Sequence, residues 1–115
     1  MRILIVEDQP AIAAIMTKLV INAGHEASPA TDGYSAVRLA AERPPEVVLL
    51  DIEMLGIDGY ETARRLRDRH GNQFPIFAVT AAVMDTPLGN QSGFSGVFAK
   101  PFSIKKLKAI ISQLS

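Results

Sequence analysis

The 115-residue chain has no cysteine, no excess charge of either sign and no long apolar run. Without cysteine, disulfides and thiolate chemistry are excluded, and a cytoplasmic location is the simplest expectation. Lysine and arginine number 12 against 12 aspartates and glutamates, so the chain as a whole does not attract nucleic acid or an anionic membrane. Its apolar runs are far shorter than a membrane span, and its first residues do not resemble a signal peptide.

What the chain does contain is typical of a packed globular protein, with 48% hydrophobic and 21% charged residues. No low-complexity or strongly charged tract indicates disorder. Because 115 residues is close to the commonest domain size, we expect one domain over residues 1–115 that folds on its own.

Short apolar runs alternate with segments whose apolar residues repeat at helical spacing. The runs predict strands over residues 2–6, 25–30, 46–50, 75–79 and 96–99. Helices are predicted from Pro10 to a stop at Gly24, from Thr31-Asp32-Gly33 to Pro44-Pro45, over 60–70, and after the cap Ser103. The spacing predicts two buried helix faces: Ile12, Ile15, Met16, Leu19 and Val20 in the first helix, and Ile104, Leu107, Ile110, Ile111 and Leu114 in the last.

This alternation predicts an α/β fold, a doubly wound five-stranded parallel sheet with helices on both faces. The flavodoxin-like order 2-1-3-4-5 fits best, because it places the strand with Pro29 at an edge and the three most apolar strands in the middle. Between residues 86 and 95, Pro87, Gly89 and Gly93 interrupt any helical stripe. The fourth helix of this fold, which is expected here between the fourth and fifth strands, is therefore predicted to be short or irregular.

Polar residues stand directly after four of the five predicted strands. Glu7 and Asp8 follow the first strand, Asp51 the third, Thr80 the fourth and Lys100 the fifth. The carboxyl ends of parallel strands meet at one edge of the sheet, where ligands bind. Three neighbouring carboxylates repel one another unless a cation neutralises them, and Mg²⁺ suits such ligands while keeping positions for phosphate oxygens. The pattern predicts a phosphoryl-transfer site in which the hydroxyl and the ammonium bind phosphate oxygens.

Four motifs at these strand ends, ILIVEDQP, LLDIEMLGIDGYE, AVTA and AKPF, together resemble the receiver domains of bacterial two-component response regulators. The resemblance covers the whole chain, and the chemotaxis regulators are among the proteins that it resembles. It implies that Asp51 is the phosphoacceptor and a ligand of Mg²⁺, and that a sensor histidine kinase or a histidine phosphotransfer protein donates the phosphoryl group. Such a chain is a stoichiometric member of a phosphorelay, not an enzyme with turnover, although self-dephosphorylation is compatible with it. Phosphorylation would switch the surface that binds a downstream protein target.

The same resemblance implies roles for the other strand-end residues. Asp8 would bind the metal directly, Glu7 would bind it through water, and the backbone carbonyl of Glu53 would be a further ligand. Thr80 would be the hydroxyl that moves to the phosphoryl group, and Lys100 the cation that pairs with it. The Lys100 peptide bond to the following proline resembles a cis junction of the family.

One departure from the family concerns the switch itself. Val97 stands where most receivers carry an aromatic residue that changes rotamer on activation. With no ring at this position, we expect activation to reorder the segment 81–95 instead.

Two other functions stay open. A magnesium-dependent phosphatase with an aspartyl nucleophile needs the same residue types, although such enzymes usually need a cap or second domain to exclude water. A pseudo-receiver that acts as a plain binding module is favoured by the irregular fourth helix and opposed by the complete set of strand-end residues.

Direct binding of nucleic acid is not expected, because Glu61 and Asp68 lie between the arginines of the third helix, and these arginines should face water. Whether the chain is a single-domain regulator or part of a larger protein is left open.

Overall fold

The computed structural model describes residues 1–54, 56–80, 94–99 and 103–114. In these ranges the strands are β1 (Arg2–Val6), β2 (Glu26–Ala30), β3 (Val47–Asp51), β4 (Ile76–Thr80) and β5 (Gly96–Ala99). The helices are α1 (Pro10–Asn22), α2 (Gly33–Glu42), α3 (Gly59–His70) and α4 (Ile104–Leu114). The predicted irregular helix between residues 86 and 95 lies outside the described ranges, except for its last two residues.

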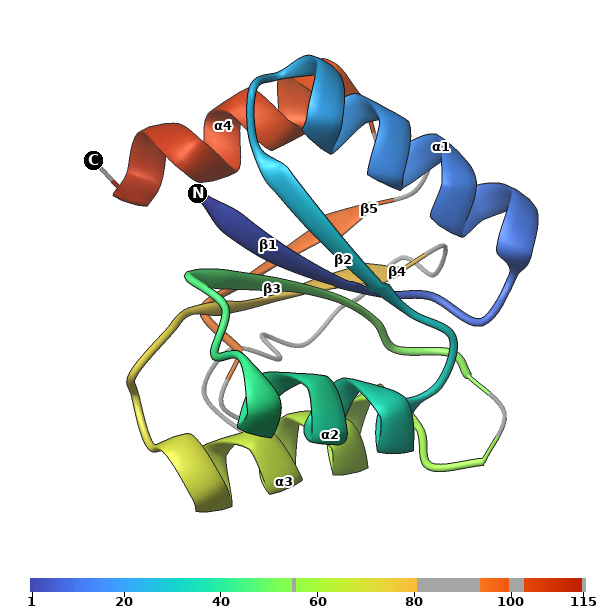
Figure 1. Cartoon of the computed structure of the whole chain (residues 1–115), viewed down its shortest axis with the longest axis vertical. Helices are drawn as coiled ribbons and strands as arrows, with labels where there is room; N and C mark the ends of the chain where they lie inside the picture. The colour runs from blue at the N-terminus through green and yellow to red at the C-terminus, as the bar shows by residue number, and fades with distance from the viewer. Residues whose placement is uncertain (55, 81–93, 100–102, 115) are drawn as a thin grey trace.

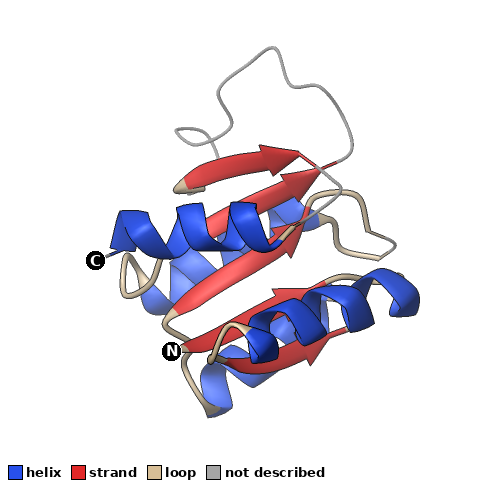
Figure 2. Ribbon diagram, turned by 90° about the horizontal axis from the view of Figure 1, so that it is seen from above, coloured by secondary structure: helices blue, strands red, loops and turns tan. Residues whose placement is uncertain are grey.

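The strands form one parallel sheet in the order β2-β1-β3-β4-β5 (Figure 1), so the predicted fold class and strand order are confirmed. Pro29 lies in β2, at the edge of the sheet, where a residue without a backbone N–H is tolerated. All five arrowheads point the same way (Figure 2), because every neighbouring pair is parallel. The carboxyl ends of the strands therefore share one edge.

Helices cover both faces of the sheet: α1 and α4 lie on one side, and α2 and α3 on the other (Figure 1). Successive residues of a strand point to opposite faces. Leu4 and Leu50 pack into the core under α2 and α3, whereas Ile5 and Leu49 pack into the core under α1 and α4. Because β1, β3 and β4 are buried on both faces, their sequences are apolar almost throughout.

Two isoleucines that the helical spacing predicted to be buried are exposed in the structure. Ile15 is 57% exposed and Ile104 is 38% exposed, although both were expected on buried faces. The buried side of α1 consists of Ala13, Met16 and Val20, and Ile15 is turned away from that side. Within the described ranges, every helix is too short or too polar to span a bilayer.

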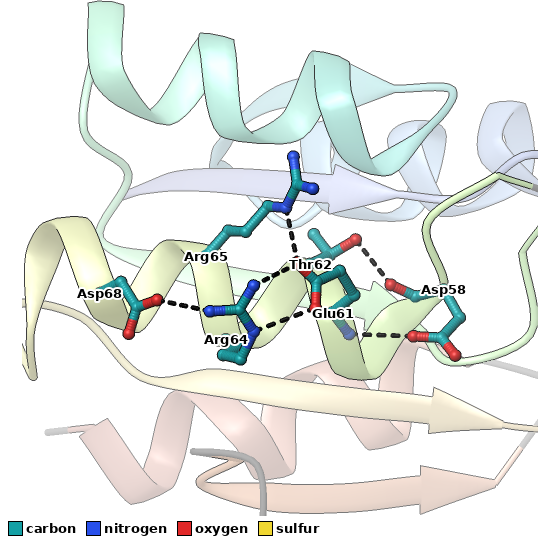
Figure 3. A network of polar contacts seen from close by, with 6 residues as sticks. All are labelled: Asp58, Glu61, Thr62, Arg64, Arg65 and Asp68. Atoms are coloured by element: carbon teal, nitrogen blue, oxygen red, sulfur yellow. Dashed lines mark hydrogen bonds and ion pairs between the residues drawn. The ribbon is translucent and has the colours of Figure 1, made fainter.

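The α3 helix starts close to the carboxyl end of β3 and carries a network of charged side chains (Figure 3). Asp58 caps the helix, since its Oδ1 accepts a hydrogen bond of 2.9 Å from the backbone N–H of Glu61. The Arg64 guanidinium donates to Glu61 and to Asp68, and Nε of Arg65 donates to Glu61 over 2.7 Å. Both arginines are thus bound to carboxylates of their own helix.

Arg67 departs from the prediction that all the arginines of this helix face water. Its guanidinium donates to the backbone carbonyls of Gly71 and Phe74, just beyond the end of α3. Burial lowers the pKa of Arg67. The Arg67 side chain therefore caps the carboxyl end of α3.

The charged network predicts how Glu61 titrates. Hydrogen bonds from Arg64 and then Arg65 lower the pKa of Glu61 from 4.5 to about 2. Since the folded-state pKa lies below the unfolded value, the network's contribution to stability is present above about pH 4.5 and is lost as the pH falls towards 2. Carbon-detected NMR of the side-chain carboxyl should show this titration, and Arg64→Gln should move it towards 4.5. With Arg69→Gln, a control on the same helix, the pKa should not change; a wild-type value near 4.5 would contradict the network.

Candidate functional site

The carboxyl ends of β1 and β3 bring three acidic residues together. One carboxylate oxygen from each of Glu7, Asp8 and Asp51 lies within 4.8 Å of the other two. The register explains this arrangement, because Val6 of β1 lies opposite Leu50 of β3 and the following residues emerge side by side. Glu7 and Asp51 are buried and Asp8 is half-buried. The three acids that the sequence pattern assigned to one edge of the sheet therefore share one site.

Strand pairing, burial and a hydrogen bond hold Asp51 at the end of β3. Asp51 pairs in register with Val79 of the neighbouring strand, and the residue is only 3% exposed. Its Oδ1 accepts a hydrogen bond of 3.1 Å from the backbone N–H of Glu53. The start of α3 closes over the same backbone: a Cβ placed on Gly59 would lie 2.5 Å from Cα of Ile52 and 2.7 Å from the carbonyl oxygen of Asp51. Position 59 therefore has no room for a side chain.

Glu7 is a fully buried carboxylate. Its backbone N–H donates to the carbonyl of Ala30 over 3.0 Å, and its Oε2 accepts a hydrogen bond of 3.3 Å from the backbone N–H of Gln9. Burying a charge is costly unless hydrogen bonds or an opposite charge compensate it. With Asp8 and Asp51 beside it, the site concentrates negative charge and offers only hard oxygen donors, which fits a divalent cation such as Mg²⁺.

Thr80 lies at the end of β4, the strand that pairs with β3 and its Asp51, and is buried. Its hydroxyl donates a hydrogen bond of 3.2 Å to Oε1 of Glu53. The sequence analysis assigned only a backbone carbonyl to Glu53 and missed this side-chain contact. No sequence pattern could have found it, because the contact depends on how the loop between β3 and α3 turns. Lys100 lies outside the described residues, so its predicted place in the site stays a prediction.

The β5 residues lie as the strand alternation predicts. Val97 is 37% exposed, whereas the ring of Phe98 points to the other face and lies 5.7 Å from that of Phe77, between centroids. Position 97 thus presents a small aliphatic side chain at the surface. The expected reordering of residues 81–95 falls almost entirely outside the described ranges.

Comparison with known sequences adds independent information on the whole chain. The model of the response regulator receiver domain matches residues 3–112. The transcriptional regulatory protein TcrA of Mycobacterium tuberculosis is 35% identical over 116 residues, which cover 99% of this chain and 46% of that protein. This chain therefore spans about half the length of that relative.

Solved structures agree with this match. The chemotaxis protein CheY4 of Vibrio cholerae superposes with a TM-score of 0.89 at 25% identity, covering 99% of this chain and 98% of the other. The receiver domain of the sensor histidine kinase PA1611 of Pseudomonas aeruginosa superposes with a TM-score of 0.87 at 30% identity, covering 97% and 94%, and has a magnesium ion in its active site cleft. With a family model that covers nearly all of its residues and these structural neighbours, the chain belongs to the receiver domains of two-component response regulators.

Proposed function

We propose that Asp51 accepts a phosphoryl group in a Mg²⁺-dependent reaction and that phosphorylation alters the surface offered to a protein partner. The observation that carries this proposal is the convergence of Glu7, Asp8 and Asp51 within 4.8 Å at the ends of two central strands. Membership of the receiver family supports a sensor histidine kinase or a histidine phosphotransfer protein as the donor.

In this proposal Asp8, Asp51 and the backbone carbonyl of Glu53 hold Mg²⁺ directly, and Glu7 holds it through water. A bound magnesium ion offsets the negative charge of the carboxylates and of the phosphoryl oxygens. The magnesium ion in the active site cleft of the PA1611 receiver supports a magnesium site in this chain. A carboxylate oxygen of Asp51 forms the new bond to phosphorus, and the bond from phosphorus to the donor's histidine nitrogen breaks with its electron pair on that nitrogen. Because each chain carries one such carboxylate, the reaction is stoichiometric, and hydrolysis of the acyl phosphate resets it.

Two further groups complete the proposed site. The Thr80 hydroxyl donates to one phosphoryl oxygen, and the Lys100 ammonium pairs with another. We propose that residues 1–115 act in the cytoplasm as one receiver domain whose direct partners are proteins. The binding of Arg64 and Arg65 to carboxylates of α3 supports this choice over contact with nucleic acid.

Mass spectrometry tests the proposal. The chain is incubated with Mg²⁺ and a small phosphodonor, and the intact mass and the modified peptide are then determined, with a metal chelator as the control. We expect one phosphoryl group on the peptide that contains Asp51, and none with the chelator. Steady turnover of a small phosphate ester would indicate a phosphatase instead, and an unmodified chain would indicate a pseudo-receiver.

The proposed ligand roles predict unequal effects on magnesium affinity. Asp8→Ala should weaken Mg²⁺ binding by about 100-fold, because it removes a direct ligand, and Glu7→Ala by about tenfold, because it removes a ligand that acts through water. Calorimetric titration measures both, with circular dichroism to verify folding. Glu42→Ala, which removes an exposed carboxylate at the end of α2, is the control and should leave the affinity unchanged. Equal losses would show that both acids coordinate directly, and unchanged binding in all three variants would rule out this metal site.

A further inference from the structure

Glu53 contacts both the proposed phosphoacceptor and the proposed switch hydroxyl. Its backbone N–H donates to Oδ1 of Asp51 over 3.1 Å, and its side-chain Oε1 accepts from Oγ1 of Thr80 over 3.2 Å. Glu53 is an exposed residue, whereas Thr80 is 1% exposed. The carboxylate of an exposed residue in the loop after β3 therefore holds a buried hydroxyl at the end of β4.

This hydrogen bond competes with the proposed contact to a phosphoryl group. A threonine hydroxyl has a single proton to donate. In the structure Thr80 uses it on Glu53, and a hydrogen bond to an ionised carboxylate is stronger than one to a neutral acceptor. A phosphoryl group on Asp51 would offer three strong acceptor oxygens. Thr80 can donate to one of them only after its bond to Glu53 breaks.

We propose that the Glu53 side chain is a positioning residue for the switch, which keeps the Thr80 hydroxyl in its resting position until Asp51 is phosphorylated. The inference rests on the proposed function of Asp51. On phosphorylation, negative charge on the phosphoryl group repels the carboxylate of Glu53, an exposed residue whose side chain can turn towards solvent. The Glu53 side chain thereby sets how strongly the resting state resists activation, a role separate from that of the Glu53 backbone carbonyl as a proposed metal ligand.

A double-mutant cycle separates this contact from simple charge repulsion. The affinity for beryllium fluoride, a non-covalent phosphoryl mimic, is measured at saturating Mg²⁺ for the wild type, Glu53→Ala, Thr80→Val and the double variant. With Thr80 present, Glu53→Ala should tighten binding by about tenfold, because the competing acceptor is gone. In the Thr80→Val background the gain should shrink to about twofold, the part due to charge alone. Equal gains in both backgrounds, or no gain, would overturn the inference.

A second measurement needs neither metal nor phosphoryl mimic. In the metal-free protein, three-bond NMR couplings report the side-chain rotamer of Thr80. We expect one rotamer in the wild type, rotamer averaging in Glu53→Ala, and the wild-type rotamer in Glu53→Gln, which keeps an oxygen acceptor but no charge. Glu42→Ala, the distant control, should also keep the wild-type rotamer. Averaging already present in the wild type would refute the contact.

The two measurements also distinguish failure of this inference from failure of the proposed function. If the wild type binds no beryllium fluoride, the phosphoacceptor assignment fails, and the rotamer of Thr80 alone decides whether Glu53 positions it. If the wild type binds the mimic and the cycle shows no coupling between the two side chains, the phosphoacceptor assignment stands and the role of Glu53 is wrong.

Discussion

Asp51→Asn is expected to abolish phosphoryl acceptance, with a rate at least about 10⁴-fold below that of the wild type. An amide oxygen is a much weaker nucleophile than a carboxylate, and the acyl phosphate cannot form on it. The substitution keeps the size of the side chain of a residue that is only 3% exposed, and the amide oxygen of asparagine can still accept a hydrogen bond from the backbone N–H of Glu53. A time course of intact mass with Mg²⁺ and a small phosphodonor measures the loss.

Asp58→Asn is the matched control for this change. It makes the same chemical substitution at the N-cap of α3, where asparagine caps as well as aspartate. We expect wild-type phosphorylation in this variant and similar thermal unfolding in both. If Asp51→Asn is phosphorylated at the wild-type rate, the assignment of the phosphoacceptor is wrong.

Gly59→Ala should have the largest effect on stability, a loss of about 3 kcal/mol or more in the free energy of unfolding. The new Cβ would lie 2.5 Å from Cα of Ile52 and 2.7 Å from the carbonyl oxygen of Asp51, and backbone atoms cannot rotate away as a flexible side chain can. Either α3 moves outwards or the end of β3 is displaced, and both disturb the site. Urea unfolding measures the change, and magnesium affinity should fall with it.

Gly71→Ala separates backbone crowding from backbone conformation. Gly71 has φ of 60° and ψ of −134°, and a Cβ there would meet no atom within 4 Å, so only conformational strain of about 2 kcal/mol is expected. Gly59 is not among the glycines with positive φ, and its substitution is unfavourable through crowding alone. Equal losses in the two variants would show that the close approach at residue 59 is relieved at little cost.

The order of the strands could be predicted from the sequence because it depends on burial. The apolar β1, β3 and β4 must be covered on both faces, and Pro29 requires an edge. The same reasoning was less successful for the helices. In α1, apolar residues occur on more than one side, so helical spacing alone did not show that Ile15 faces solvent. Which side faces the sheet was decided by packing.

The acidic site, too, could be predicted from the sequence only in part. Since parallel strands end at a common edge, the sequence alone indicated that Glu7, Asp8 and Asp51 would lie together. Their separation, within 4.8 Å, depends on the register of β1 against β3. The hydrogen bond from Thr80 to Glu53 joins the end of β4 to the loop after β3. Only the tertiary structure decided that contact, because the loop's backbone conformation follows no periodic pattern of residues and is set by the elements that it connects.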